Sequence, residues 1–295
     1  MSMTAAVIGA SGFIGRILSQ KLADAGHSVY CLDRAPISIL QCRWIPYDAL
    51  QPAVQLPRLD AVFYLAQSVH YRSFPEHAED LFGVNTLGAI KAAQAAKEAG
   101  CRFFCYASSG NVYVPSFDPM TEDFPVSRAS PYGLSKLMAE EALDCFSSWM
   151  QATSVRIFGA YGPGQKAMLP YAIKQRILAD EPVSLASSAD GDADGLRLSL
   201  IYADDLVWCL LRLCEKALAG ESLPRRINLA GPENISLRRL ATSIADCLGR
   251  QALFVSAEQK RQGDLLADIS LLRSYLQPPF TTFAEGIRLF CSQMT

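Results

Sequence analysis

The chain has 295 residues, half of them hydrophobic, so it is long enough to bury the core of one large domain or two smaller ones. Its 27 basic and 29 acidic side chains give a net charge of −2. This balance excludes a global field that would attract DNA, RNA or an anionic membrane. We therefore expect small-molecule partners, with no nucleic acid and no membrane.

The nine cysteines are scattered and form no CxxC pair, which is typical of reduced, mostly buried thiols in a cytoplasmic protein. Residues 1–10 carry no basic segment and run directly into a strand pattern, so we expect no signal peptide. The apolar stretch 206–213 is short and flanked by charged residues, which argues against a membrane-spanning helix.

Short β-branched or aromatic runs alternate with longer segments of helical periodicity. The expected strands are residues 5–8, 28–32, 61–65, 103–107 and 153–158, and the expected helices are residues 14–25, 82–99 and 131–150. This alternation predicts an α/β fold in which helices cover both faces of a parallel sheet, the doubly wound Rossmann architecture.

The alternation of strand-like and helical segments ends at residues 161–164. A helical stretch at 169–179 and a polar loop at 187–195 follow. We expect a Rossmann domain over residues 1–165 and a smaller C-terminal substrate-binding subdomain over residues 166–295, with residues 196–230 returning to the first domain. Residues 190–195 copy the opening of a calcium loop. However, Ile201 stands where a bidentate glutamate is required, and no histidine has metal-ligand spacing, so no metal is expected.

A glycine-rich turn follows the first expected strand and opens the first helix, with glycines at positions 9, 12 and 15. Such a turn lets the backbone approach a pyrophosphate, which the helix N-terminus then binds. Asp33 ends the second expected strand, where a carboxylate can bind both ribose hydroxyls of NAD and repel the phosphate of NADP. Arg34 keeps NADP open as an alternative cofactor. For Asp33, the alternative to ribose binding is a solvated turn residue.

Tyr132 and Lys136 lie four residues apart, on one face of a helix that Ser130 and Pro131 can start. A lysine cation beside a phenol favours the phenolate, which could take a proton from an alcohol. Ser109 follows the strand 103–107, at the sheet edge where ligands of such folds bind, and could hold the reacting oxygen. Without Tyr132, a turn-forming role for this serine would be preferred.

With these residues the chain resembles the extended short-chain dehydrogenase/reductase superfamily, and within it the NAD-dependent epimerase/dehydratase family, which mostly acts on nucleotide sugars. Further segments match the family in order along nearly the whole chain: residues 47–49, 65–67, 84–88, 156–165, 202–205 and 228–231.

The resemblance implies specific site residues. The catalytic residues would be Tyr132, Lys136 and Ser109. The cofactor-binding residues would be Gly9, Ser11, Gly12, Phe13, Ile14, Gly15, Asp33, Arg34, Asp48, Ala49, Leu65, Ala66, Gln67, Asn85, Tyr132 and Lys136. The substrate-binding residues would be Ser109, Gly110, Asn111, Arg197 and Arg261, the two arginines resembling those that clamp a nucleotide diphosphate.

Two departures from the family pattern affect the predicted reaction. Gly159 replaces an asparagine that contacts substrate in relatives, which leaves the substrate open. Gly110 and Asn111 replace the acidic pair that dehydratases carry after the catalytic hydroxyl residue, so we do not expect dehydration.

The sequence thus predicts an NAD-dependent nucleotide-sugar epimerase that works through a keto intermediate. An NAD(P)-dependent dehydrogenase or reductase of a sugar or other alcohol is the alternative. A non-enzymatic NAD-sensing regulator is disfavoured because all three catalytic residues are kept. The helical segments 82–99 and 139–150 carry small and apolar residues on more than one face, and relatives often dimerise there, so we expect a homodimer.

Overall fold

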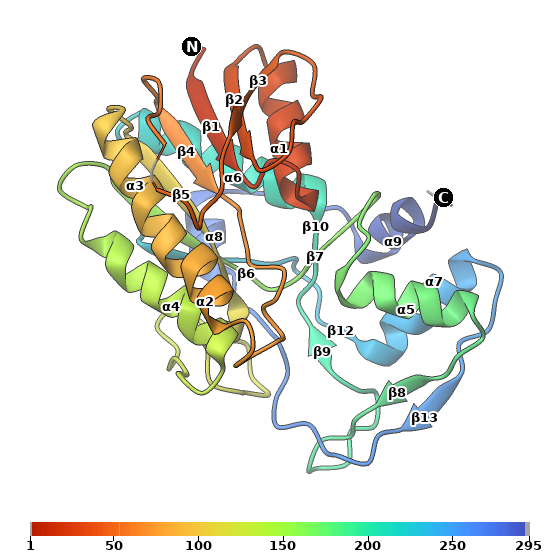
Figure 1. Cartoon of the computed structure of the whole chain (residues 1–295). Helices are drawn as coiled ribbons and strands as arrows, with labels where there is room; N and C mark the ends of the chain where they lie inside the picture. Colours follow the sequence, from red (N-terminus) through yellow and green to blue (C-terminus); the bar gives the residue numbers. More distant parts are fainter. Residues whose placement is uncertain (1, 53, 293–295) are drawn as a thin grey trace. The chain divides into compact units, whose positions relative to one another are not determined.

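The computed structural model describes residues 2–52 and 54–292. Its central element is a seven-stranded sheet with the order β11-β6-β5-β4-β1-β2-β3 (Figure 1). The strands are β1 (Thr4–Ile8), β2 (Ser28–Asp33), β3 (Cys42–Pro46), β4 (Ala61–Tyr64), β5 (Phe103–Ser109), β6 (Gln151–Ile157) and β11 (Arg226–Leu229). The pairs from β3 through β5 are parallel, which confirms the predicted Rossmann α/β fold.

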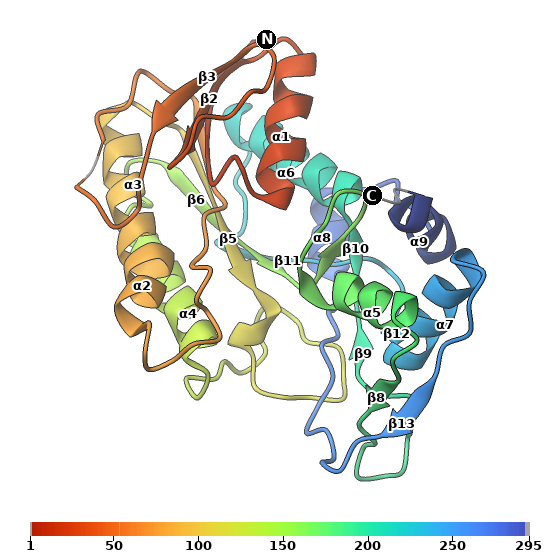
Figure 2. The same cartoon turned by 45° about the vertical axis from the view of Figure 1, so that its right-hand side comes forward.

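Helices cover both faces of this sheet. Figures 1 and 2 show α3 and α4 on one face and α1 and α6 on the other. The helical elements here are α1 (Phe13–Asp24), α2 (Ala78–Phe82), the π-helical turn η1 (Gly83–Leu87), α3 (Gly88–Glu98), the 3-10 turn η2 (Gly110–Val112), α4 (Pro131–Asp144) and α6 (Ala203–Leu218). Small alanines on the buried face of α3 pack against strand side chains such as Tyr64 and Phe104, so helix and sheet approach closely.

The chain divides into two compact units. Unit 1 comprises residues 1–113, 125–156 and 207–227, and unit 2 comprises residues 114–124, 157–206 and 228–295. The sequence analysis placed the first boundary at 165/166 and the return segment at 196–230. The short segment 114–124 has a loop-like sequence that gave no sign of belonging with the C-terminal part.

Unit 2 has its own core, built mainly from apolar residues of helices and short strands. Its elements are β7 (Ala160–Tyr161), α5 (Met168–Leu178), β8 (Val183–Leu185), β9 (Arg197–Leu198), β10 (Ile201–Tyr202), β12 (Ile235–Ser236), α7 (Leu237–Cys247), β13 (Phe254–Ser256), α8 (Ser270–Tyr275) and α9 (Phe283–Ser292). Its strands form three small two-stranded sheets, β10-β7, β12-β9 and β13-β8.

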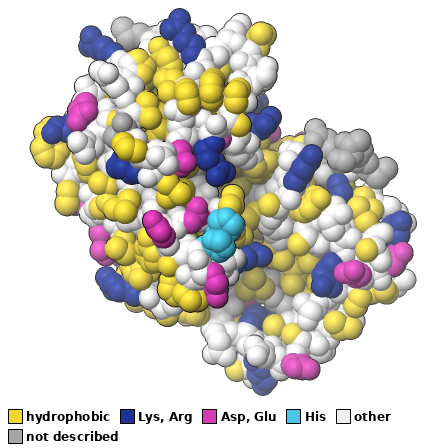
Figure 3. All heavy atoms as spheres, viewed as in Figure 1, with side chains coloured by type: hydrophobic (Ala, Val, Ile, Leu, Met, Phe, Trp, Pro, Cys, Tyr) yellow, Lys and Arg dark blue, Asp and Glu magenta, His cyan; other side chains and the backbone are white. Residues whose placement is uncertain are grey.

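The surface agrees with the charge balance of the sequence. On the face shown in Figure 3, basic and acidic side chains are interspersed, with no broad field of one sign. Among the described residues, no helix combines the length and the apolar character that crossing a membrane requires.

A buried carboxylate ties α4 to the sheet. Glu140, on α4, is fully buried and accepts from Arg156 of β6 at 3.0 Å (Nε) and 2.7 Å (a terminal nitrogen). It also binds the hydroxyl of Ser108 at the end of β5 and the Nε of Arg226 on β11 at 3.3 Å. The phenolic oxygen of Tyr113 accepts from Arg156 at 2.9 Å. One side chain thus fixes the helix relative to three strands.

Replacing this carboxylate is expected to destabilise the protein strongly. Glu140→Gln leaves the buried Arg156 cation without its counter-charge, which costs about 3–5 kcal/mol of unfolding free energy. Glu141→Gln is the matched control, because its ion pair with Arg128 is exposed and contributes at most about 1 kcal/mol. Urea unfolding followed by fluorescence measures both, and equal losses in the two variants would contradict the structural role of Glu140.

Candidate active site

The glycine turn between β1 and α1 is held by its own backbone. Gly9 N donates to Leu32 O at 3.0 Å, and Gly12 N donates to Gly9 O at 3.1 Å. A Cβ at Gly15 would lie 2.2 Å from Gly9 O, so only glycine permits this contact between helix and turn. No side chain caps the N-terminus of α1, which leaves its first N–H groups available to an anion.

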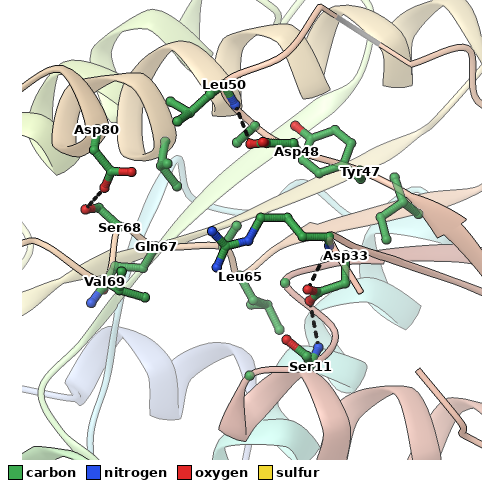
Figure 4. A pocket seen from close by; sticks show the side chains of 17 residues that line it. Ser11, Asp33, Tyr47, Asp48, Leu50, Leu65, Gln67, Ser68, Val69 and Asp80 are labelled. Carbon is green, nitrogen blue, oxygen red and sulfur yellow. Dashed lines mark hydrogen bonds between the residues drawn. The ribbon is translucent and has the colours of Figure 1, made fainter. Parts of the chain in front are cut away.

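Asp33, at the end of β2, fixes the turn and borders a pocket (Figure 4). One carboxylate oxygen accepts from Ser11 N and the other from Arg34 N, both at 2.9 Å. Asp33 therefore stabilises the turn through these bonds and is also positioned to contact a ligand in the pocket. Both oxygens retain lone pairs that could accept from ribose hydroxyls.

The pocket has a volume of about 260 Å³, just below the range of about 300–1,000 Å³ that is typical of small-molecule sites. Ten of the predicted cofactor residues line it: Gly9, Ser11, Gly12, Asp33, Arg34, Asp48, Ala49, Leu65, Ala66 and Gln67. The other lining residues, which the sequence analysis did not predict as contacts, are Leu32, Tyr47, Leu50, Ser68, Val69, Asp80 and Val84. The predicted residues outside the lining are Phe13, Ile14, Gly15, Asn85, Tyr132 and Lys136.

Asn85 lies in the π-helical turn η1 and is fully buried. Its side-chain oxygen accepts from Ser68 N at 3.0 Å, and its side-chain nitrogen donates to Ser135 Oγ at 3.0 Å. The backbone oxygen of Asn85 accepts from the hydroxyl of Tyr106 at 2.8 Å. The contacts of this predicted cofactor residue thus join the segment after β4 to α4.

The three predicted catalytic residues come together at the carboxyl edge of the sheet. Ser109, the last residue of β5, accepts from the backbone and side-chain nitrogens of Asn111 at 3.2 and 3.1 Å, and its hydroxyl also hydrogen-bonds Tyr132. The Tyr132 hydroxyl donates to Gln67 Oε1 at 2.9 Å. Lys136 Nζ lies 6.0 Å from the centre of the Tyr132 ring and donates to the backbone oxygen of residue 107 at 2.9 Å.

Burial dominates the protonation of this pair. It raises the pKa of Tyr132 to about 12, although the hydrogen bond with Ser109 acts in the opposite direction. Burial likewise lowers the pKa of Lys136 to about 7, despite the attraction of Glu140 for the ammonium. The prediction from the sequence took into account the nearby positive charges, which favour the phenolate, and left burial out. Because burial cannot be read from the spacing of two residues, this opposing effect was missed.

Comparison with known proteins decides the family. The sequence profile of the NAD dependent epimerase/dehydratase family matches residues 5–230. The chain belongs to this family. The predicted family is therefore confirmed, and the NAD dependence named in the family's description bears out the predicted cofactor.

Relatives of the chain include more than one activity. A UDP-glucose 4-epimerase of Mycolicibacterium smegmatis is 27% identical over 84% of this chain and 83% of the relative. A dTDP-4-dehydro-6-deoxyglucose reductase of Escherichia coli is 24% identical over 84% of this chain and 82% of the relative. The solved structure of MoeE5 in complex with UDP-glucuronic acid and NAD is 25% identical, with a TM-score of 0.81 and 98% coverage of both chains.

Unit 2 brings together the two arginines that resemble the family's diphosphate clamp. Both bind the buried Asp264, Arg197 Nε at 2.7 Å and Arg261 Nε at 3.0 Å. Arg261 is buried and also binds Asp192 at 2.7 Å, whereas the side chain of Arg197 is 40% exposed. The two arginines thus differ in exposure. Asp264, which the sequence analysis did not assign to the site, bonds to both of them.

The two departures from the family pattern have distinct surroundings. Gly110 is buried and Asn111 is exposed, with Asn111 holding Ser109 as described. Gly159, between β6 and β7, has φ +142°, which side chains rarely adopt, and a Cβ there would meet Leu200 at 2.9 Å.

The calcium-like loop has a different role in the structure. Asp192 pairs with Arg261, and Asp190 binds the hydroxyl of Ser188. Over residues 2–52 and 54–292, no group of three or more His, Cys, Asp or Glu side chains is arranged to hold a metal ion.

The buried Lys136 should make stability depend on pH. Because its folded pKa of about 7 lies below the ordinary 10.5, the unfolded chain holds a proton that the folded chain lacks between these values. The free energy of unfolding should therefore rise with pH between about 7 and 10.5. Below about pH 7 the folded chain carries the buried Lys136 ammonium, and the full cost of burying this charge lowers its stability.

Urea unfolding of wild type and Lys136→Met at pH 7.5 to 9.5 tests this dependence. The wild-type free energy should gain about 1 kcal/mol per pH unit relative to the variant. Lys21→Met replaces an exposed lysine of α1 and should parallel wild type. Parallel curves for wild type and Lys136→Met would show that Lys136 stays protonated in the fold.

Proposed function

We propose that the protein is an NAD-dependent nucleotide-sugar epimerase that acts by transient oxidation of a sugar hydroxyl to a ketone. The observation that carries this proposal is the convergence of Tyr132, Ser109 and Lys136 at the sheet edge, with Gln67 contacting Tyr132 and also lining the pocket of Asp33. Hydroxyl, phenol and amine are the groups needed to move a proton to and from an alcohol. The UDP-glucose 4-epimerase and the UDP-sugar complex among its relatives support the substrate class.

Each residue has a defined role in this proposal. Ser109 holds the reacting oxygen, and Tyr132 takes the hydroxyl proton and later returns it. In its protonated form, Lys136 stabilises the phenolate against the effect of burial; because burial lowers the pKa of Lys136 to about 7, this support is present near neutral pH and is lost as the pH rises. NAD, when bound, supplies the acceptor for the hydride and gives it back, so that no cofactor is consumed.

The cofactor residues favour NAD over NADP. The uncapped start of α1 would hold the pyrophosphate, and Asp33 would accept from the adenosine ribose. Its negative charge opposes a ribose phosphate, although Arg34 lies in the same lining. Asp48 and Ala49 border the same pocket and would contact the adenine side of the cofactor. Phe13, Ile14, Gly15 and Asn85 would act by shaping the turn and the adjoining segment.

Arg197 and Arg261 are proposed to recognise the diphosphate of the substrate. Arg197 has the more exposed side chain, and its terminal nitrogens are not used in its bonds with Asp264. Arg261 contributes charge and, with Asp264, holds the site. Asn111 keeps Ser109 in place, and neither Gly110 nor Asn111 supplies an acid for eliminating water.

A net dehydrogenase or reductase is the second candidate. Gly159 removes a side chain that contacts substrate in relatives, and a reductase stands among the proteins similar to this chain. The same catalytic residues serve both reactions. The fate of the cofactor separates the two, because only a net oxidation accumulates NADH.

Incubation with UDP-, GDP- and dTDP-hexoses, followed by NMR of the sugar, tests the proposed function. We expect inversion at one carbon without net change of cofactor, and a 10²- to 10⁴-fold lower kcat in Tyr132→Phe, because the proton acceptor is lost. Tyr275→Phe is the matched control and should retain activity. Stoichiometric absorbance of reduced cofactor would instead favour the dehydrogenase, and no reaction on any sugar with NAD bound would contradict both.

We also propose that the protein is a cytoplasmic homodimer that pairs through α3 and α4. Leu87, which precedes α3, Met138 on α4 and Trp149 beyond α4 are 58%, 43% and 57% exposed, and a partner helix would bury these large apolar side chains. In the described residues no disulfide joins any of the nine cysteines, which fits a reducing compartment.

Charges on this helical face should separate the subunits. Light scattering after size exclusion should give twice the chain mass for wild type and the single-chain mass for Leu87→Glu/Met138→Glu, because a buried unpaired carboxylate is costly. Leu253→Glu, at a residue 45% exposed in unit 2, should remain dimeric. A monomeric wild type, or a dimeric double variant, would refute this interface.

A further inference from the structure

The segment that follows β4 holds the catalytic phenol from two sides. Gln67 accepts the Tyr132 hydroxyl at 2.9 Å, and the Tyr71 ring lies 5.2 Å from the Tyr132 ring, centre to centre. Arg72 in turn lies 5.2 Å from the Tyr71 ring. Because Gln67 also lines the Asp33 pocket, it stands between the cofactor pocket and the phenol.

The backbone around Gln67 is firmly anchored while its amide remains free to turn. Leu65 N donates to Ile8 O at 2.8 Å, and Ser68 N donates to the side-chain oxygen of Asn85 at 3.0 Å. Ser68 also binds Asp80 through its hydroxyl. The Gln67 side chain itself is exposed, and its bond to Tyr132 uses only Oε1. The anchor fixes the amide within reach of Tyr132 without fixing which end of the amide faces it.

A side-chain amide carries one accepting and one donating end. The accepting oxygen, as found here, suits a protonated phenol, and the Nε2 group suits a phenolate. A half-turn of the amide exchanges the two ends. Ser109 already receives two bonds from Asn111, and Lys136 donates to a backbone oxygen, so Gln67 is the neighbour best able to follow both states.

We propose that Gln67 is a positioning residue for the acid-base chemistry of Tyr132, accepting from the phenol and, after an amide turn, donating to the phenolate. This inference rests on the proposed function, in which Tyr132 cycles between the two states. A hydrogen bond to a charged partner is stronger than one to a neutral partner, so Gln67 favours the phenolate on balance.

Other groups around the Tyr132 phenol also influence its pKa. Lys136 faces the ring from α4, Tyr71 from the segment after β4, and Tyr106 and Ser109 from β5. Burial raises the pKa of Tyr132 to about 12, and Tyr71 adds to this increase. A partner that stabilises the phenolate therefore acts against the strongest influence on the group.

The test compares Gln67→Met, which keeps the length and loses both ends of the amide, with Gln67→Glu, which keeps only accepting oxygens. The test uses the NAD-loaded protein, because the positive charge of the nicotinamide ring would favour the phenolate and bring the Tyr132 midpoint below the pKa of about 12 that burial alone sets. This protein is labelled at the ζ-carbon of tyrosine, and the Tyr132 resonance, assigned with Tyr132→Phe, is titrated from pH 7 to 10.5. We expect the midpoint to rise by about one pH unit in Gln67→Met and further in Gln67→Glu. Gln94→Met, an exposed glutamine of α3, is the control and should match wild type.

Kinetics provide the second readout. The acidic limb of the kcat profile should move to higher pH by the same amount, and kcat at neutral pH should fall about tenfold in Gln67→Met while KM changes little. Equal midpoints and profiles in wild type and both Gln67 variants overturn the role of Gln67 alone. A wild-type Tyr132 resonance that does not move over the whole range contradicts instead the proposed function of Tyr132.

Discussion

The ion pair between Glu140 and Arg156 is the interaction on which the placement of the proposed catalytic groups depends. A carboxylate without solvent is tolerated only when its charge and its lone pairs are fully used, and here two arginines and a serine use them. Tyr132 and Lys136 precede Glu140 by eight and four residues on α4, and thus lie along the same side of the helix. The pair therefore sets the position of the helix and supplies the nearest negative charge to Lys136.

The buried polar side chains of the π-helical turn η1 are also hydrogen-bonded to α4. Asn85 and Thr86 both bind Ser135 of α4, Asn85 through its side-chain nitrogen and Thr86 by donating to the Ser135 backbone oxygen at 2.7 Å. A π-helical turn widens the helix locally and is frequent at functional sites. Here it turns two polar side chains into the core, where they connect α4 with the segment that carries Gln67. Hydrogen bonds thus join α4 both to the sheet, through Glu140, and to η1, through Ser135.

Local patterns predicted the fold because each had a direct physical meaning. The glycine turn and the Tyr132–Lys136 spacing depend on contacts between residues close in sequence, and both were identified with the correct neighbours. The edge strand β3 was missed, since its five residues are mostly exposed and show no buried apolar run. The predicted helix 131–150 ends at Asp144 in the structure.

The long-range contacts could not be predicted in the same way. Gln67 and Tyr132 are 65 residues apart, and Arg261 and Asp192 are 69 apart. No local periodicity indicates such pairs, and the burial that opposes charge on Tyr132 and Lys136 arises only when the chain is folded. The sequence therefore predicts which groups react, whereas the fold determines the protonation of Tyr132 and Lys136.

The backbone at Gly159 limits which residues this position can accept. At φ +142° an asparagine would be strained, and the buried Leu200 would also have to yield. A side chain at this position would therefore need a different backbone conformation of the loop, and the end of the Leu200 side chain would have to shift with it. Gly159 thus couples the choice of residue at this position to the path of the loop between β6 and β7.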